Sequence, residues 1–168
     1  MSHHFYAMLS RMKYITRWGL MRNTRPENLS EHALEVAVLA HALAILGNTR
    51  LGLDLDPDRA ASLALFHDAS EILTGDLPTP VKYAAPDIKL AYKQVERDAA
   101  CRLLEMLPAD LQASYRALLL PEEADPALRS IVKAAEDVYK RQVLHCDDSK
   151  NKGEVFYYDL QKAIRSTV

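Results

Sequence analysis

His67 and Asp68 stand next to each other in an otherwise largely apolar stretch of the sequence. Both are metal-binding side chains, and an aspartate in an apolar segment is rarely tolerated unless it is paired or coordinates a metal ion. His32 lies upstream of this pair, and the acidic residues Glu136 and Asp137 lie far downstream. Two histidines, Asp68 and a late carboxylate give a nitrogen and oxygen donor set that suits a borderline or hard divalent cation. The pattern therefore predicts a metal site with positions left open for water and substrate.

A further carboxylate, Glu71, closely follows the His-Asp pair. If residues 56–73 form one helix, Glu71 shares a face with His67 and Asp68, because positions three and four apart are neighbours on a helix. A divalent ion there would lower the pKa of a bound water and polarise a phosphoryl oxygen, which hydrolysis of a phosphomonoester requires. We therefore predict that Glu71 moves the proton in such a reaction.

A short basic segment precedes these residues. Between positions 11 and 25 the sequence contains no acid and the cations Arg11, Lys13, Arg17, Arg22 and Arg25. This segment is basic enough to attract a small phosphorylated ligand, although the whole chain carries a net charge of -2. Because proteins that bind polyanions usually have a broad basic excess, this balance argues against a nucleic-acid polymer as the main ligand.

Length and composition predict one soluble globular domain made of helices. The 168 residues are 49% hydrophobic and 26% charged, which is enough to bury a core. Five glycines and no sustained period-two alternation leave strands with little support. We see no apolar run of about 18 residues and no signal-peptide pattern, so we expect a cytoplasmic protein that does not contact a membrane. Cys101 and Cys146 match no metal or redox motif and are typical of a reducing compartment.

Local signals predict the helices that must position the metal-binding residues. Asn28 and Glu31 form a capping pair for a helix over residues 28–46, and Gly47 is expected to end it. The apolar face expected for this helix carries Leu34, Val38, His41 or Ala42, and Ile45. Further helices are predicted over residues 56–73, 86–108, 109–120 and 125–135, with a turn-rich loop over residues 74–80. These helices must form a bundle to gather the ligands.

Seven segments of the sequence resemble a known family. They are Leu9-Ser10-Arg11, Arg17-Trp18, Leu20-Met21-Arg22-Asn23, Glu27-Asn28, Ser30-Glu31-His32, His67-Asp68-Ala69-Ser70-Glu71 and Leu73-Thr74-Gly75-Asp76-Leu77-Pro78-Thr79-Pro80-Val81-Lys82-Tyr83. The order of a histidine, a His-Asp pair and a later acid is similar to the HD-domain metal phosphohydrolases, and the longer segments look like the bacterial YfbR-type 5′-deoxynucleotidases. The resemblance covers residues 4 to about 136. It implies an all-α HD-domain helical bundle and a cytoplasmic homodimer that hydrolyses deoxyribonucleoside 5′-monophosphates.

The resemblance also implies roles for individual residues. By position, His32, His67 and Asp68 bind one divalent metal ion, with cobalt, manganese, zinc and magnesium all left open. Two residues are expected to be catalytic, Glu71 as the proton carrier and Arg17 as the group that orients the phosphate. The residues expected to contact the substrate are Arg17, Trp18, which flanks the sugar, His32, Asp68, Asp76, Leu77, Pro78 and Thr79.

The sequence departs from the family pattern at the last metal ligand. In the family this ligand is an aspartate after a segment like Val-Lys-Ala-Ala, whereas here residues 132–135 are followed by Glu136 and then Asp137. Glu136 keeps the register but is one methylene longer, and Asp137 has the right length but is turned by about 100° around a helix. We favour Glu136 as the ligand. Residues 1–136 are interpreted as an HD-domain core that is incomplete at its C-terminal end relative to the family.

Residues 137–168 contain no motif that we recognise from the family. The segment 137–142, Asp-Val-Tyr-Lys-Arg-Gln, looks like the translated end of a transposon used to prepare sequencing libraries. The hypothesis is therefore that this tail is a foreign join without functional meaning.

Two classes of function follow from these patterns. The first is a metal-dependent 5′-deoxynucleotidase. The second is a helical module that binds metal or nucleotide without turnover because its fourth ligand is displaced. Another HD hydrolase, acting on a different phosphorylated nucleotide, is a third reading. Release of phosphate from deoxynucleoside monophosphates separates the first reading from the second.

Overall fold

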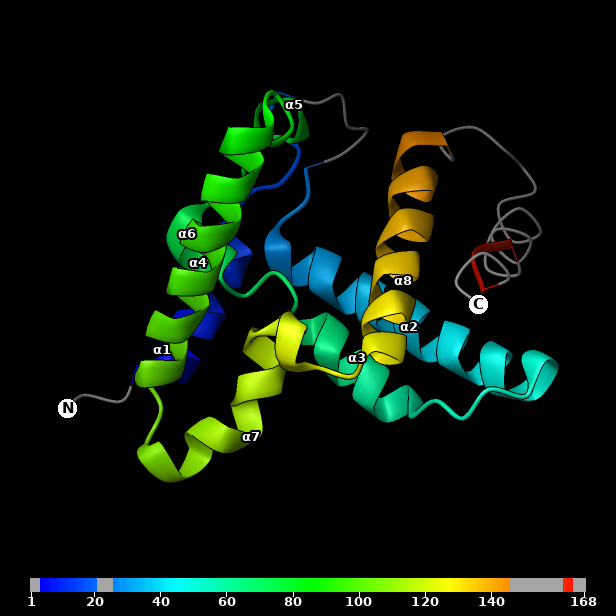
Figure 1. The fold of residues 1–168 in the computed structure, drawn as a ribbon. Coiled ribbons are helices and arrows are strands. Elements are labelled where there is room, and N and C mark those ends of the chain that lie inside the picture. Colours follow the sequence, from blue (N-terminus) through cyan, green and yellow to red (C-terminus); the bar gives the residue numbers. More distant parts are fainter. Residues whose placement is uncertain (1–3, 21–25, 146–161, 165–168) are drawn as a thin grey trace. The chain divides into compact units, whose positions relative to one another are not determined.

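A computed structural model describes residues 4–20, 26–145 and 162–164 of the chain. Over these residues the chain is helical, and its one β-type pairing is an isolated antiparallel bridge between Thr16 and Asn28. The elements drawn in Figure 1 are α1 Phe5–Leu9, the 3₁₀ helix η1 Ser10–Tyr14, α2 Leu29–Leu51, α3 Pro57–Phe66, α4 Glu71–Thr74, α5 Thr79–Lys82, α6 Pro86–Glu105, α7 Ala109–Leu119, the 3₁₀ helix η2 Pro121–Glu123 and α8 Pro126–His145. The predicted all-α fold class is confirmed.

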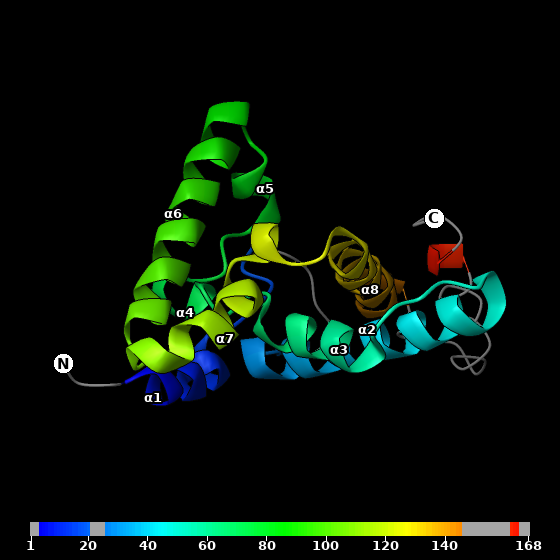
Figure 2. The same cartoon turned by 60° about the horizontal axis from the view of Figure 1, so that its bottom comes forward.

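The chain forms two compact units. The first contains Met1–His32 and Phe66–Glu123, and the second contains Ala33–Leu65 and Ala124–Val168. In the first unit, α6 packs against α7, and α1 lies beside the C-terminal end of α6 (Figure 2). The buried core of this unit consists of Phe5, Ala69, Ala100, Leu103, Leu104, Leu107, Leu119 and Leu120. Every predicted site residue other than Glu136 and Asp137 belongs to this unit.

The second unit buries apolar side chains from α2, α3 and α8, including Val36, Leu63 and Ile131. The helix predicted over residues 125–135 is longer in the structure, where α8 continues to His145. Val138 and Tyr139, which lie beyond the predicted end, are buried. The apolar periodicity of α8 therefore persists past the last residue at which family motifs are recognised.

The predicted apolar face of α2 is wrong. Leu34, Val38 and Ile45 are exposed, by 59%, 62% and 44%. The buried apolar residues of the helix are instead Leu29, Ala33, Val36, Ala37, Leu39, Ala40, Leu43 and Ala44, and four of these are alanines. Since α2 is apolar on most of its circumference, periodicity could not choose the face. Small side chains let neighbouring elements approach closely, and this packing decided the outcome.

Gly47 does not end α2, as the sequence had indicated. The helix continues to Leu51, and Gly52, with a φ of 67°, follows its end. A Cβ added at Gly47 would lie 3.0 Å from side-chain atoms of both Leu53 and Ile164. Glycine is therefore kept at this position for close packing, and the left-handed turn that a helix end favours is supplied by Gly52.

His67 and Asp68 lie in a turn and not on a continuous helix. α3 ends at Phe66, and α4 begins at Glu71. Between them, the backbone N–H of Ala69 donates to the carbonyl of Phe66 at 3.0 Å, and that of Glu71 donates to the carbonyl of Asp68 at 3.0 Å. The prediction of one helix over residues 56–73 was wrong because the polar contacts of these side chains outweigh helix propensity at this point.

α2 is long and apolar enough to cross a membrane if only length and composition are considered. Half of its apolar window is buried inside the protein, however, and core helices of soluble proteins pass the same test.

The helices predicted over residues 86–108 and 109–120 are confirmed as α6 and α7. The short elements α1, η1 and α5 were not predicted. α5 begins within the predicted loop, at Thr79, and its first turn holds Pro80, at a position where a missing N–H costs nothing.

Candidate active site

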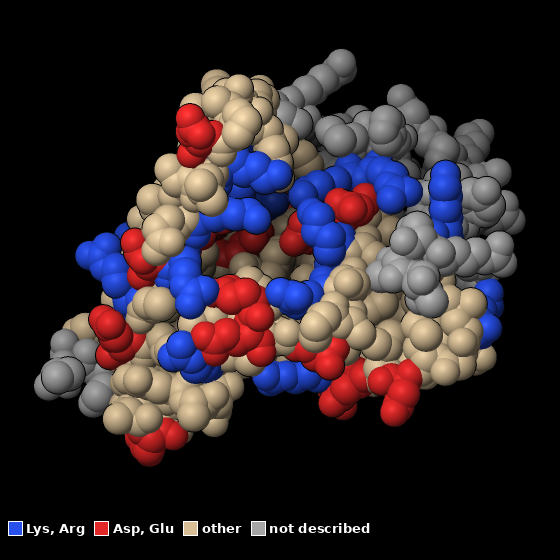
Figure 3. All heavy atoms as spheres, viewed as in Figure 1, with Lys and Arg blue, Asp and Glu red and all other residues tan. Residues whose placement is uncertain are grey.

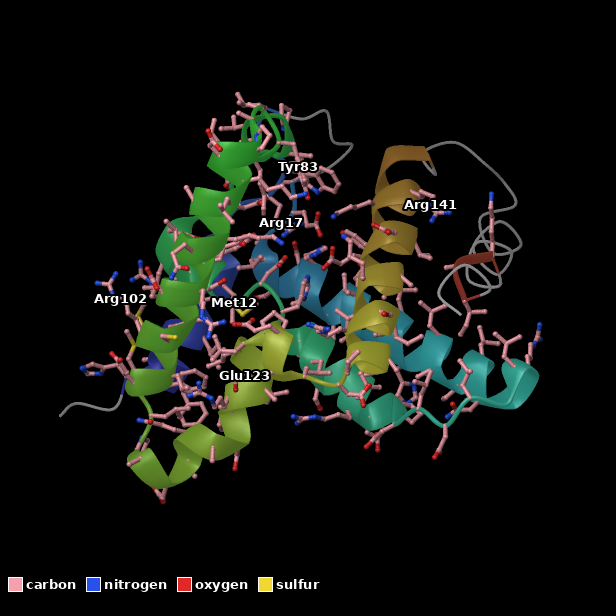
Figure 4. The ribbon with its side chains drawn as sticks, viewed as in Figure 1. Met12, Arg17, Tyr83, Arg102, Glu123 and Arg141 are labelled. Atoms are coloured by element: carbon pink, nitrogen blue, oxygen red, sulfur yellow. The ribbon has the colours of Figure 1, made fainter. Side chains whose placement is uncertain are left out.

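Two backbone segments of the site, residues 15–17 and 27–29, pair with each other. The N–H of Arg17 donates to the carbonyl of Glu27 at 3.0 Å, and the N–H of Leu29 donates to the carbonyl of Ile15 at 2.9 Å. This short pairing places Arg17 and Trp18 beside the segment that leads into α2. Figure 4 shows Arg17 near the N-terminal end of α2.

The predicted capping pair fixes the start of α2. Asn28 Oδ1 accepts hydrogen bonds from the N–H groups of Ser30 and Glu31, at 3.0 and 3.1 Å. Glu31 Oε2 accepts the N–H of Asn28 at 3.1 Å in return. This reciprocal cap satisfies helix donors that would otherwise lack partners. It also sets the position of His32 in the first turn, where its side chain is 1% exposed.

His32, His67 and Asp68 come together as predicted. One potential ligand atom from each of the three lies within 4.8 Å of the other two. Asp68 Oδ2 lies 3.5 Å from His32 Nε2 and 3.1 Å from His67 Nε2. Ligands about 2.0–2.2 Å from one ion are roughly 3.0–3.4 Å apart at bond angles between 90° and tetrahedral. The spacing and the donor types therefore fit one divalent ion held by these three residues.

Arg17 binds the carboxylates of this cluster. Its Nη1 lies 3.0 Å from Asp68 Oδ2 and 3.7 Å from Glu71 Oε2, and its side chain is only 10% exposed. Burial opposes the charge of Arg17, but Asp68, Asp76 and two further carboxylates outweigh burial and raise its pKa. The Nε atom of Arg17 is buried and makes no hydrogen bond within the described part of the chain.

Asp68 and Glu71 have opposite protonation tendencies. Burial works against ionisation of Asp68, but His67, His32 and Arg17 together hold its pKa well below the usual value. For Glu71, burial and the charges of Asp68 and Asp76 raise the pKa to about 9. These opposite shifts favour an ionised Asp68 beside a protonated Glu71 at neutral pH, an arrangement suited to acid–base chemistry.

Glu27 is part of the site and was not singled out from the sequence. Its side chain is buried, one oxygen accepts the indole N–H of Trp18, and the other lies 3.6 Å from His32 Nδ1. No spacing rule points to it, because it precedes the helix that carries His32. The available signal was its place as the first acid after the basic segment 11–25.

The predicted nucleoside-contacting loop lies next to the Trp18 segment. Asp76, Leu77 and Pro78 are partly buried, and Thr79 is exposed. A Cβ added at Gly19 would lie 3.3 Å from Pro78 Cγ, so the chain after Trp18 touches this loop.

Residues of α6 contact the two ends of the same loop. Tyr92 Oη donates to the carbonyl of Gly75 at 2.9 Å, and Lys82 Nζ donates to Glu96 Oε1 at 2.6 Å. The ammonium of Lys82 also lies 4.9 Å from the ring centroid of Tyr92. These contacts anchor both ends of residues 76–81.

The other predicted metal ligands and the basic residues belong to other elements. Glu136 and Asp137 lie on α8 in the second unit, where they contact lysines, and their role as metal ligands stays a prediction. Arg11 and Lys13 are exposed on η1, and Arg22 and Arg25 lie outside the described residues.

Comparison with known proteins gives the family. Residues 4–168 match the model of the YfbR-like 5′-deoxynucleotidases. The chain belongs to this family. A 5′-deoxynucleotidase of Shewanella oneidensis is 45% identical to it over 163 residues, which are 97% of this chain and 83% of that protein. The resemblance seen in the motifs is thereby confirmed. The match of this YfbR-like chain includes residues 137–168, beyond the recognised motifs, and the foreign origin of that tail stays a hypothesis.

Solved structures confirm the HD-domain fold of this YfbR-like protein. An HD-domain phosphohydrolase from Listeria innocua has a TM-score of 0.76 at 23% identity, with 98% of this chain and 78% of that chain covered. A cyanophage S-2L HD phosphohydrolase, described as bound to dA and one catalytic Zn²⁺ ion, has a TM-score of 0.60 at 24% identity, with 95% and 82% covered.

Proposed function

We propose that this YfbR-like protein is a metal-dependent 5′-deoxynucleotidase that hydrolyses deoxyribonucleoside 5′-monophosphates to deoxynucleoside and phosphate. The observation that carries the proposal is the convergence of three groups in one unit. These are the histidine and aspartate cluster, the buried guanidinium of Arg17, and the protonated carboxyl of Glu71. The Shewanella relative is named a 5′-deoxynucleotidase, which supports the same substrate class.

Arg17 is proposed to orient the phosphate. A guanidinium offers a planar fork of donors that matches phosphate oxygens. Only Nη1 of Arg17 contacts Asp68, and the buried Nε has no hydrogen-bond partner among the described residues. A phosphate oxygen of the substrate would accept a hydrogen bond from that Nε–H, which would satisfy this donor of the guanidinium.

Glu71 is proposed to supply the proton for the leaving group. As water attacks phosphorus and the bond from phosphorus to the 5′-oxygen breaks, that oxygen must receive a proton. Glu71 has a pKa raised to about 9. Its Oε2 lies 3.7 Å from Arg17 Nη1, the atom that also contacts Asp68. It therefore holds a proton at neutral pH beside the proposed phosphate position. The proton released by the attacking water then restores the acid.

A divalent ion is proposed at His32, His67 and Asp68, whose spacing and donor types fit one. When bound, such an ion supplies Lewis-acid polarisation of a phosphoryl oxygen. Zinc is the first ion to test, because the cyanophage HD phosphohydrolase is described with one catalytic Zn²⁺. Cobalt, manganese and magnesium also remain in the proposal.

Trp18 and residues 76–79 are proposed to contact the deoxynucleoside. The two segments touch through Gly19 and Pro78, and Trp18 follows the phosphate-orienting Arg17 directly. A ring fixed beside the sugar would discriminate against the extra 2′-hydroxyl of a ribonucleotide by contact. The preference for deoxyribonucleotides is thus assigned to Trp18, the neighbour of Arg17 in the chain.

A cytoplasmic homodimer is proposed as the working form, on the basis of the family resemblance. Light scattering of the purified protein tests the dimer.

The surface charge supports a small substrate and not a nucleic-acid polymer. Figure 3 shows acidic side chains dispersed among the basic ones over the face in view.

The experiment that tests the function is phosphate release from a panel of deoxyribonucleoside and ribonucleoside 5′-monophosphates, with each of the four metals. We expect metal-dependent release that is faster with deoxyribonucleotides. Binding of metal or nucleotide without release would favour the non-catalytic module. Release from nucleoside triphosphates alone would favour another HD hydrolase.

A further inference from the structure

Glu27 connects two parts of the site that have different proposed tasks. It is 8% exposed, and both of its carboxylate oxygens face a ring. Oε2 accepts the indole N–H of Trp18, and Oε1 lies 3.6 Å from His32 Nδ1. One buried side chain thus contacts both the residue assigned to the sugar and a residue assigned to the metal.

The charge of Glu27 beside His32 bears on which nitrogen of that ring takes the proton, because Oε1 lies 3.6 Å from Nδ1, a separation at which the attraction is electrostatic and not a hydrogen bond. A carboxylate facing Nδ1 favours a proton on Nδ1, because an ionised carboxylate can only accept hydrogen bonds. The lone pair of the imidazole is then on Nε2, the atom that lies 3.5 Å from Asp68 Oδ2. Such carboxylate and histidine pairs orient metal ligands in many proteins, and their loss typically costs about 10–100-fold in metal affinity.

The contact with Trp18 holds an unfavourable backbone conformation. Trp18 has a φ of 66°, in the left-handed region that bulky residues rarely adopt. Two interactions oppose this tendency. One is the indole hydrogen bond to the Glu27 side chain, and the other is the backbone hydrogen bond from Arg17 to the Glu27 carbonyl. Glu27 therefore fixes the residue that precedes Trp18 as well as its ring.

We propose that Glu27 is a positioning residue that couples the orientation of the metal ligand His32 to the position of the sugar-flanking Trp18. The inference rests on the proposed function, because it gives those two residues their tasks. It adds that metal occupancy and sugar recognition depend on each other through one carboxylate. Binding of an ion at His32 draws on the same side chain that holds the indole, so the indole environment changes when metal binds.

The sequence provides a direct reporter, because Trp18 is the single tryptophan of the chain. Its fluorescence can be followed while Zn²⁺, which does not quench by itself, is added to the full-length protein. We expect a saturable change in the emission of the parent protein, with a midpoint that agrees with the Zn²⁺ affinity from calorimetry.

Glu27→Gln is the informative variant. An amide keeps the size of the side chain and can still accept the indole N–H, but it removes the negative charge beside His32 Nδ1. We expect about 10-fold or greater loss of Zn²⁺ affinity and a reduced or absent fluorescence response. Glu27→Asp, which keeps both acceptors on a shorter stem, should recover part of each. Glu105→Gln, an exposed acid on α6, is the matched control and should behave as the parent does.

The outcomes separate this inference from the proposed function. A parent protein that binds Zn²⁺ with a fluorescence change but releases no phosphate leaves the coupling intact and removes the enzymatic proposal. A Glu27→Gln protein with the parent's Zn²⁺ affinity and fluorescence response overturns the coupling, whatever its activity. Circular dichroism shows whether each variant is folded. If Glu27→Gln does not fold, the parent protein decides, because Zn²⁺ binding by calorimetry without a change in Trp18 fluorescence also overturns the inference.

Discussion

Two pairs of acidic residues in this protein, one beside Arg17 and one on α8, have opposite surroundings. Asp68 and Glu71 have side chains exposed by 22% and 8%, and they share one buried guanidinium. Their pKa values are driven apart, that of Asp68 well below its usual value and that of Glu71 to about 9. Two carboxyls with different protonation states side by side are what acid–base chemistry needs.

The pair on α8 has flexible partners instead. Glu136 contacts Lys133 and Lys140 at 3.0 and 3.4 Å, and Asp137 contacts Lys133 at 3.6 Å. Such ion pairs one helical turn apart are worth only roughly 0.2–0.5 kcal/mol each. A lysine can turn away at little cost, whereas Arg17 is held by burial. The first pair therefore shares one buried cation, whereas the α8 pair is held by lysines that are themselves exposed.

The largest effect is expected from removing the proton carrier. Glu71→Ala should lower kcat by about 100-fold or more, the usual scale for the loss of a general acid. Its metal content should stay near that of the parent, because Glu71 is placed beside the metal cluster and not in it. Phosphate release and metal analysis of the same preparation measure both quantities. Near-parental turnover with metal bound removes Glu71 from the mechanism.

The next effect concerns the shared guanidinium. Arg17→Lys keeps the positive charge but loses the planar fork, so kcat/KM for deoxynucleotides should fall by about 10-fold or more. Thermal stability should change less, since a cation remains beside Asp68. Arg102→Lys, on α6, is the control. If Arg17→Lys hydrolyses the substrate as the parent does, Arg17 serves only to neutralise Asp68.

A smaller effect is expected from the α8 pair. If Glu136 holds the register of the missing aspartate, Glu136→Ala should weaken metal affinity by about 10-fold, and Asp137→Ala should change it much less. Titration of each variant with Zn²⁺ measures this. The reverse ranking shows a one-residue shift in the ligand position. If both variants keep the parent's metal affinity, the site has three protein ligands.

These differences explain what the sequence could predict. The cap of α2 by Asn28 and Glu31 was predictable, because it depends on residues three apart in the chain. The cluster of His32, His67 and Asp68 was predictable from residue types. The turn that carries His67 and Asp68 was not, because it results from contacts with residues such as Arg17, distant in sequence.

Glu27 and the buried face of α2 were missed for related reasons. Glu27 acts through a tryptophan and a histidine on different segments, and no local spacing encodes that contact. On α2, apolar residues occur on most of the helix, so the choice between Leu34 and Ala33 as the inner residue depended on what packs there. Residues whose role depends on a contact between two distant segments cannot be predicted from helix periodicity or residue propensity.

The smallest expected effect is a change in folding stability with pH, caused by Glu71. The pKa of Glu71 is raised from 4.5 to about 9 in the folded protein. Between these values the unfolded chain releases a proton that the folded protein keeps, so unfolding becomes easier as the pH rises. The contribution of Glu71 to stability is complete below about pH 4.5 and is lost as the pH rises through 9.

Glu71→Gln cannot ionise, so without metal its Tm should rise relative to that of the parent between pH 5 and pH 8.5. A gain of about 1 kcal/mol corresponds to roughly 2–4 °C for a chain of this size. Differential scanning calorimetry at several pH values, with a chelator present, measures the gap. Glu105→Gln, on the exposed side of α6, should keep a constant difference from the parent over this range. A constant gap for Glu71→Gln would mean that Glu71 is ionised beside Asp68 despite its burial, and that both acidic pairs of the protein are held by their cations alone.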